Sequence, residues 1–441
     1  MVNAIPAMIS MLVILVYNIA DTFFIGQTGD EMQVAAVSLA TPVFLLFMAV
    51  GTLFGIGGTS VISRAFGEGK TEYARRVSSF CFWASLFTGL LFIALFYLGM
   101  DQILGWIGVS QYTEHFARVY LECVTWSAPC VIISNAFSNI VRAEGKSAEA
   151  TIGMLIGTIV NIVLDPIFIL TLEKGIEGAA WATVIGNVIA TLYYLFILTG
   201  KKTQLSIAWR DFQCTLRIVK DVFSIGIPAS LNSIMMSVSN IILNIFLVSY
   251  GDIPLAAMGV AMKVNMIVVL LQIGLGQGIQ PLLGYCYGAK KWERFQKIVR
   301  FSNIMGFTLG IFQTAVCYLF AQTIVRCFID SDEIFDYGVY FIRVLLVSGP
   351  LIGILFVYIN ALQAVGAAKY SLILSLCRQG FIFLPCLVIC NRLFQLDGLV
   401  IAQPIADILS CVIAVWLFNR MKKKNFGLHF NQITNKQPQI T

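Results

Sequence analysis

Long runs of apolar residues alternate with short polar segments along the whole chain of 441 residues. Each run is close to the roughly 20 apolar residues that an α-helix needs to cross a bilayer. We therefore predict twelve membrane-spanning helices, at residues 4–25, 34–62, 77–99, 118–141, 150–172, 177–199, 222–248, 254–283, 299–321, 341–363, 369–391 and 399–418. The predicted fold class is an all-α integral membrane protein.

The composition supports this fold class. The chain is 58% hydrophobic and only 12% charged, whereas a soluble globular protein has about 25% charged residues. The first apolar run lacks both a preceding basic segment and a small-residue cleavage site, so we expect an uncleaved span rather than a signal peptide. Eleven cysteines are scattered singly, which favours packing residues over disulfides or a metal site.

Basic residues gather in every second loop and predict the orientation of the chain. The loops at residues 63–76, 200–221 and 285–300 are rich in Lys and Arg, whereas the alternate loops are acidic. Since basic loops stay in the cytoplasm, we expect both termini there. Basic loops on anionic lipid account for the net charge of +6, so no nucleic-acid partner is expected.

The second half of the chain repeats the first at a nearly constant offset. The matched positions are Pro6 and Pro228, Gly29 and Gly251, Gly67 and Gly288, Asn139 and Asn360, Gly145 and Gly366, and Gly178 and Gly398. Each repeat holds six predicted spans, so both repeats enter the membrane in the same orientation. We predict an N-terminal lobe at 1–200, a cytoplasmic linker at 201–221, a C-terminal lobe at 222–419 and a basic cytoplasmic tail at 420–441.

Such a pair of six-helix bundles suits alternating access, in which a cavity between the lobes opens to one side and then to the other. Duplicated bundles also serve as scaffolds and receptors. A scaffold, however, gives no reason to keep acidic residues within a lobe, and this chain has two, Asp21 and Asp165. A carboxylate in hydrocarbon costs several kcal/mol unless it is neutralised or paired, so these positions are candidate transport sites.

The two acids are predicted to lie at one depth. Asp21 is near the outer end of the first span and Asp165 is about seven residues from that of the fifth, at about 1.5 Å per residue. Asn161 shares a helix face with Asp165, Thr183 is level with it in the sixth span, and Tyr17 is one turn before Asp21. These oxygen atoms are suited to a Na+ ion, or to a trapped proton.

Simpler roles for the same residues stay open. Asp165 is also placed for a structural hydrogen bond to Asn161, and Asp21 for snorkelling to the outer surface. Elsewhere, we expect Asp407 and Arg378 to form an ion pair within the second lobe. Lys263 either snorkels or lines the cavity.

Four segments resemble the multidrug and toxic compound extrusion (MATE) family, in its DinF-like bacterial branch: Pro6, residues 17–26 (YNIADTFFIG), 142–145 (RAEG) and 161–166 (NIVLDP). The resemblance implies a V-shaped antiporter in which H+ or Na+ entry drives export of organic cations and other amphipathic compounds. It implies no other cofactor, and its partners would be drugs or toxins and membrane lipids. We expect a monomer.

Carried over by position, the resemblance makes Asp21, Asn161, Asp165 and Thr183 the coupling site, where Na+ would bind if it is the coupling ion. Tyr17 would lie alongside, and Pro6 would be a bending point of the first helix. Asn135 and Asn139, four residues apart in the fourth span, are candidates for the substrate cavity wall.

The chain departs from NorM-like relatives in one respect. Those relatives use a glutamate in the seventh span and an aspartate in the tenth, whereas residues 222–248 and 341–363 contain no carboxylate. Coupling through the second lobe is therefore not expected to follow their pattern. Only five residues precede Pro6, which leaves open a start upstream of Met1.

Three other functions fit the sequence less well. A flippase for lipid-linked oligosaccharide, from the same superfamily, would carry cationic residues in the cavity, whereas the first lobe offers acids. A major-facilitator transporter would carry an Asp–Arg motif that residues 63–70 lack. Enzyme activity is not expected, because the chain has neither HExxH nor GxSxG and both histidines lie in predicted loops.

Overall fold

The computed structural model describes residues 3–27, 31–107, 109, 112–328 and 331–434. Within these ranges, the side chains of residues 18–19, 21–22, 25–26, 31, 34, 327–328, 332 and 424–434 are not among those described. Nearly every described residue is helical, and the described ranges contain no β-strand. The prediction of an all-α fold is confirmed.

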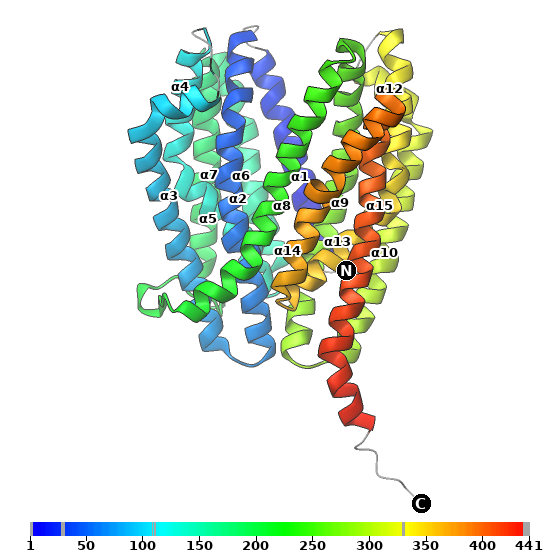
Figure 1. The fold of residues 1–441 in the computed structure, drawn as a ribbon. Coiled ribbons are helices and arrows are strands. Elements are labelled where there is room, and N and C mark those ends of the chain that lie inside the picture. Colours follow the sequence, from blue (N-terminus) through cyan, green and yellow to red (C-terminus); the bar gives the residue numbers. More distant parts are fainter. Residues whose placement is uncertain (1–2, 28–30, 108, 110–111, 329–330, 435–441) are drawn as a thin grey trace, which may run out of the picture. The chain divides into compact units, whose positions relative to one another are not determined.

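The chain forms two compact units, Met1–Ser230 and Leu231–Thr441. Within each unit, the long helices run side by side (Figure 1). The first unit contains α1 (Ala4–Gly26), α2 (Glu31–Gly67), α3 (Thr71–Ile107), α4 (Glu114–Trp126), α5 (Ala128–Ala143), α6 (Ser147–Pro166), the π-helical turn η1 (Ile167–Thr171), α7 (Gly175–Thr199), the short 3-10 helix η2 (Trp209–Asp211) and the beginning of α8 (Leu216–Val248).

The second unit takes up α8 and continues in the same order. Its further elements are α9 (Asp252–Gly288), α10 (Trp292–Leu319), α11 (Ala321–Phe328), α12 (Asp332–Leu345), the 3-10 helix η3 (Leu346–Ser348), α13 (Gly349–Ala364), α14 (Ala368–Leu376), the π-helical segment η4 (Cys377–Ile382) and α15 (Phe383–Thr434). A π-helical segment therefore follows both α6 and α14, the equivalent helices of the two repeats.

The helices are long and apolar enough to cross a bilayer in eight stretches of the described residues, or nine if α4 and α5, which meet at 55°, form one broken span. The twelve ranges predicted from the sequence fall almost entirely on helices. The number of apolar stretches is smaller than the twelve predicted spans partly because the last two predicted spans share one stretch, Ala368–Lys423. Gln395, with φ of 52°, interrupts the helical geometry there. The number twelve stays a prediction.

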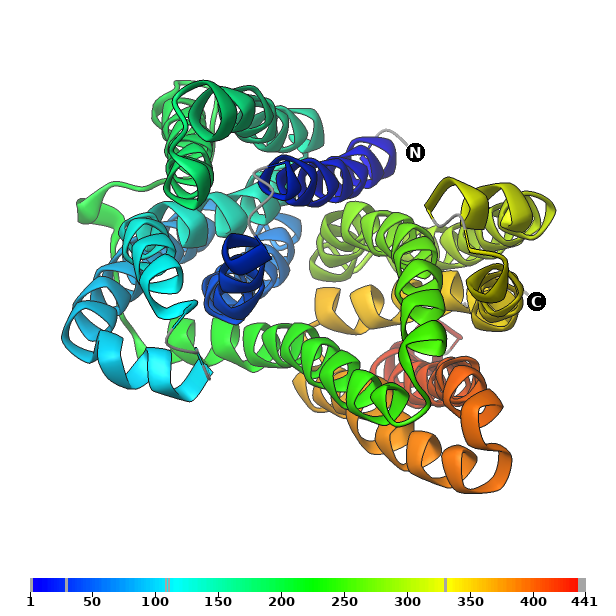
Figure 2. The same cartoon turned by 90° about the horizontal axis from the view of Figure 1, so that it is seen from above.

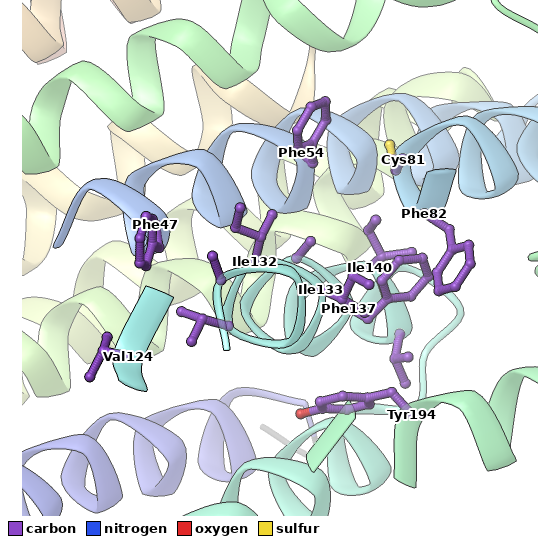
Figure 3. Close-up of a cluster of buried hydrophobic side chains, with 14 of the residues drawn as sticks. Phe47, Phe54, Cys81, Phe82, Val124, Ile132, Ile133, Phe137, Ile140 and Tyr194 are labelled. Carbon is purple, nitrogen blue, oxygen red and sulfur yellow. The ribbon is translucent and has the colours of Figure 1, made fainter. Parts of the chain in front are cut away.

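Each unit is built around one almost fully buried helix, α5 in the first and α13 in the second. The helix α5 packs against α2, α3, α6 and α7, and α13 packs against α9, α10, α14 and α15. Figure 3 shows the core around α5, where Phe137 and Ile132 meet side chains from α2, α3 and α7. Because lipid is as apolar as these side chains, close packing rather than exclusion of water holds such helices together.

The central helices repeat one another in atomic detail. They have the same length, and one offset relates both their first and their last positions. Asn139 Nδ2 donates to the carbonyl of Asn135 at 3.0 Å, and Asn360 Nδ2 donates to that of Phe356 at 2.9 Å. In each unit a glycine of the neighbouring helix, Gly55 or Gly276, lies against this amide. The predicted duplication is therefore confirmed.

The linker lies on the first unit as a fixed strap, which we define as residues 200–215 (Figures 1 and 2). Trp83 Nε1 donates to the carbonyl of Ile207 at 3.1 Å, and Trp209 packs edge-on against the Trp83 ring. Phe212 stacks on Trp209, with ring centroids 4.9 Å apart. At its start, the strap is bound by Glu144, which accepts hydrogen bonds from Thr203 and from the backbone of Gln204.

Charge also holds the strap in place. Arg75 Nη2 lies 3.2 Å from Asp211 Oδ2. A hydrogen bond from Ser206, together with the Arg75 guanidinium, holds the pKa of Asp211 below its usual value, since both favour the charged carboxylate.

The predicted lobe boundaries differ from the division into compact units. The linker predicted at 201–221 gives way to α8 at Leu216, and the first unit extends to Ser230. The reason is packing: Gly226 lies directly against the backbone of Leu53 in α2, so the first turns of α8 belong to the first unit. At the other end, α15 continues past residue 419 without a break, to Thr434.

The glycine contact at the centre of the second unit yields a test. In Gly276→Ala, the new methyl group would collide with Asn360 Nδ2, so α9 and α13 must separate and the unfolding free energy should fall by about 1–3 kcal/mol. Gly259, on the same helix, has open space around it, and Gly259→Ala should be neutral or stabilising. Thermal unfolding of the purified protein measures both, and equal unfolding temperatures would contradict the assigned contact.

Candidate functional site

The candidate coupling site is built on α6. Asn161 and Asp165, four residues apart, lie on one face of this helix, as its periodicity requires. Both are buried, with exposed fractions of 2% for Asn161 and 0% for Asp165. The helix ends at Pro166 and continues as the π-helical turn η1. Such turns are frequent at functional sites because they shift side chains out of the regular α-helical register.

Two glycines bring α7 close enough to complete the cluster. A Cβ atom on Gly157 would lie 2.9 Å from the carbonyl oxygen of Gly186, and one on Gly186 would lie 2.7 Å from that of Gly157. Only a pair of glycines permits so close an approach of two helix backbones. The approach places Thr183 of α7, which is 2% exposed, beside Asn161.

The amide of Asn161 links the acid to α7. Its best orientation has Nδ2 donating to Asp165 Oδ2 at 3.2 Å while Oδ1 accepts from the backbone N–H of Thr183 at 3.1 Å. This orientation is assigned because each amide atom then has a partner of the right kind. The predicted convergence of Asn161, Asp165 and Thr183 is therefore seen in the structure.

The first helix reaches the cluster through Tyr17. Its hydroxyl lies 3.5 Å from Thr183 Oγ1, where either group can donate. Asp21 follows Tyr17 by four residues in the sequence, but its side chain lies outside the described residues. Its meeting with Asp165 therefore stays a prediction.

Sequence reasoning missed one polar residue of this region, Asn187. Its Nδ2 donates to the backbone carbonyl of Thr183 at 2.9 Å, and its Oδ1 accepts from Ser134 of α5 at 3.3 Å. Asn187 thus ties the coupling cluster to the central helix of the unit. Its position four residues after Thr183, within an apolar span, was the signal that could have identified it.

The structure gives Asn135 and Asn139 a packing role. Asn135 Nδ2 donates to the carbonyl of Met48 at 2.6 Å and lies 3.2 Å from Thr52 Oγ1, so it holds α5 against α2. Asn139 bonds within α5 and accepts from Arg142 at 3.3 Å. Whether a helix face lines a cavity or packs against another helix depends on the neighbouring helices, which the sequence of one span does not reveal. The assignment of these residues to the cavity wall stays a prediction.

Pro6 lies in the first turn of α1, where a proline breaks no helical hydrogen bond. Its carbonyl accepts hydrogen bonds from Ser10 at 3.0 Å and from Thr151 of α6 at 2.8 Å. Pro6 therefore anchors α1 to α6 in this structure, and its role as a bending point stays a prediction.

The predicted ion pair of the second unit is confirmed. Arg378 Nε lies 3.0 Å from Asp407 Oδ1, and the two side chains are 2% and 1% exposed. Lys263, on α9, has an exposed side chain that makes a polar interaction, so both predicted roles for it stay open.

The first-unit cluster offers a carboxylate, an amide and two hydroxyls within one buried region. These hard oxygen donors suit a small cation such as Na+, and a buried carboxylate equally takes up a proton. Among the described side chains, no three His, Cys, Asp or Glu residues gather in a way that could hold a metal ion. The donor set of the cluster is thus suited to reversible binding of a small cation or a proton.

Fold and site together define a helical membrane protein of two successive repeats with a buried acid in the first. A family model described as MatE matches residues 6–167 and again residues 228–388. The two matches begin at Pro6 and Pro228, which the sequence repeat relates, so each repeat contains one copy. The chain belongs to the MATE family.

Individual relatives agree over almost the whole length. The "Multidrug export protein MepA" of Staphylococcus saprophyticus is 32% identical over 418 residues, covering 94% of this chain and 91% of the relative. The crystal structure of a MATE protein in complex with MaL6 has a TM-score of 0.91 at 26% identity, with 96% and 95% of the two chains covered. The outward-facing structure of a multidrug resistance MATE transporter has a TM-score of 0.90 at 27% identity, with the same coverage. None of these distinguishes the DinF-like branch, which stays a prediction.

The burial of Asp165 can be tested chemically. A carbodiimide reacts with a protonated carboxyl group, and with an exposed fraction of 0% Asp165 should react with the apolar dicyclohexyl reagent but not with a charged, water-soluble one. Glu333, which is exposed near the start of α12, should react with the water-soluble reagent. Peptide mass spectrometry locates the adducts. Rapid labelling of Asp165 by the charged reagent would contradict its burial.

Proposed function

We propose that this protein is a secondary antiporter that exports drugs or toxins in exchange for H+ or Na+ bound at the Asp165 cluster. The observation that carries the proposal is the fully buried carboxylate of Asp165, with the Asn161 amide and the Thr183 hydroxyl beside it. Relatives of similar length named as multidrug export proteins support the same class of cargo.

The energetic logic follows from burial. An ionised carboxylate inside the membrane is costly, so the state with a bound cation is favoured when the site is closed. Cation binding at Asp165 changes the hydrogen bonds of Asn161 and Thr183, and Thr183 contacts Tyr17 of α1. The position of α1 is thereby coupled to the charge of the site. This coupling is the proposed switch between the inward-open and outward-open states of the transport cycle.

The membrane potential and the ion gradient supply the work. One elementary charge that moves through 100 mV releases about 2.3 kcal/mol. For an uncharged cargo, one cation that enters through the site therefore drives a concentration ratio of roughly fifty-fold per 100 mV, since 1.4 kcal/mol corresponds to a factor of about ten. For a monovalent organic cation the two charges cancel, and the concentration gradient of the coupling ion supplies the work. The cargo class is amphipathic organic cations and related compounds, for which apolar and Met-rich surface is suitable. The proposed location is a bacterial plasma membrane, with the basic loops and both termini in the cytoplasm.

The first test neutralises the acid. Asp165→Asn should reduce ethidium efflux to background, because the amide removes the charge that a cation compensates. Efflux from reconstituted vesicles is measured under an imposed pH gradient and then under a sodium gradient, which identifies the ion. Asp211→Asn is the matched control, since it makes the same chemical change in the strap, and should retain efflux. Undiminished efflux by Asp165→Asn would reject the mechanism, and lipid scrambling without ethidium efflux by the wild type would favour a flippase.

The second test removes the hydroxyl that joins α1 to α7. Thr183→Val loses the contact with Tyr17, which lies 3.5 Å away, but keeps the shape of the side chain. Loss of one hydrogen bond should raise the ion concentration for half-maximal efflux by roughly tenfold. Thr199→Val, on the same helix, is the control, because the Thr199 hydroxyl is exposed and bonds only to its own helix. Identical ion dependence of the two variants would remove Thr183 from the site.

A further inference from the structure

The second unit contains a buried acid of its own, in the helix pair equivalent to α6 and α7. The offset that relates α5 to α13 also relates the start of α6 to the start of α14, and each of these helices is followed by a π-helical segment. Arg378 lies in this segment, η4, and Asp407 lies on α15, the partner helix. The helix pair that carries the proposed coupling site in the first repeat thus carries a complete ion pair in the second.

The two repeats use corresponding positions differently. With the offset that relates Gly178 to Gly398, Gln403 corresponds to Thr183 and Asp407 to Asn187. In the first repeat, α7 holds the hydroxyl of Thr183 and the amide of Asn187, and the acid is on α6. In the second repeat, α15 holds the amide of Gln403 and the acid, and η4 supplies the guanidinium.

The carboxylate of Asp407 receives hydrogen bonds from three sides. Arg378 Nε donates to Oδ1 at 3.0 Å, Gln403 Nε2 donates to Oδ1 at 3.2 Å, and Ser348 Oγ donates to Oδ2 at 3.2 Å. The Arg378 guanidinium also lies 5.0 Å from the centre of the Phe356 ring, on the central helix α13. The ring and the hydrogen bonds together hold the cation against the acid.

We propose that Arg378 is a tethered cation that keeps the second-repeat acid neutralised throughout the transport cycle, so that ion exchange is confined to the first repeat. This inference rests on the proposed antiport at Asp165. It specifies that the transporter has one ion-exchanging site, which lies in the first repeat. A guanidinium keeps its proton in proteins, so the neutralising charge cannot leave with the solvent. Both side chains are buried, and separating them would leave two uncompensated charges in an apolar unit.

A proton or Na+ must therefore displace Arg378 to reach Asp407. Arg378 of η4 and the Cys411 thiol, on the same helix as Asp407, are charged or titratable groups next to Asp407. The neighbouring elements η3 and α13 contribute Ser348 and Phe356, which are not titratable. The absence of carboxylates from residues 222–248 and 341–363 agrees with a second repeat that does not exchange ions.

The test measures the unfolding temperature of purified protein against pH and against Na+, with choline replacing Na+ at constant ionic strength. Asp165→Asn is the background, because it removes the proposed first-repeat site, and it should show no Na+ dependence. Adding Arg378→Met leaves Asp407 with no tethered cation. At pH 8 without Na+ the unfolding temperature should then fall by about 10 °C and should recover with Na+ or on acidification to pH 6.

A third variant tests whether the new cation dependence comes from Asp407. Adding Asp407→Asn to Asp165→Asn/Arg378→Met removes the acid as well and should abolish the new cation dependence. Arg378→Lys keeps a tethered charge and should remain independent of Na+. If Arg378→Met creates no cation dependence, the proposed role of Arg378 is wrong.

The background variant also tests the inference if Arg378→Met does not fold. Any Na+ dependence of Asp165→Asn that Asp407→Asn removes would overturn the inference, because it would show Asp407 exchanging its partner in the native pair. Na+ dependence of Asp165→Asn that persists after Asp407→Asn would instead contradict Asp165 as the acid of the coupling site, and would support the conclusion that the second-repeat pair does not exchange ions.

Discussion

In the apolar interior of a bilayer, a polar side chain cannot form hydrogen bonds with water, so its hydrogen-bond partners must come from the protein. The close contact of Gly157 with Gly186 answers this constraint in the first unit, because it brings Asn161 within hydrogen-bonding distance of Thr183 and so gives the amide beside Asp165 a partner on α7. A larger side chain at either glycine would separate the helices and leave these polar groups without their partners. The candidate coupling site therefore depends on a backbone contact rather than on the acid alone.

Duplication supplies the same scaffold twice, and the polar residues decide what each copy does. Asn139 and Asn360 make the same bond in both central helices, so this part of the scaffold has been retained. In the peripheral pair, a neutral amide lies beside the first acid and a guanidinium beside the second. Under the proposed antiport, a cation from solution neutralises the first acid, whereas a cation of the chain itself neutralises the second. The proposal thus assigns the repeats different roles without a change of fold.

The strap, which connects the two repeats, is packed against the first unit over much of its length. Trp83, Glu144 and Arg75 bind it to the first unit, and the first turns of α8 follow it there through Gly226. A flexible linker would let the two repeats move independently after residue 199. In this arrangement the chain leaves the first unit only near Ser230, within a helix. The boundary between the two units therefore falls within α8 and not within a loop.

The sequence by itself determined the helices, the repeat and the pairing of Arg378 with Asp407, because hydrophobic length, fixed offsets and the cost of isolated buried charge are local or additive properties. It also placed Asn161 and Asp165 on one face, since helical periodicity is local. Only the tertiary structure decided that Asn135 donates to Met48, that Asn187 joins the site and that residues 200–215 form a strap. Which helix a given face meets depends on contacts between distant segments, such as that of Gly157 with Gly186, and no single span contains that information.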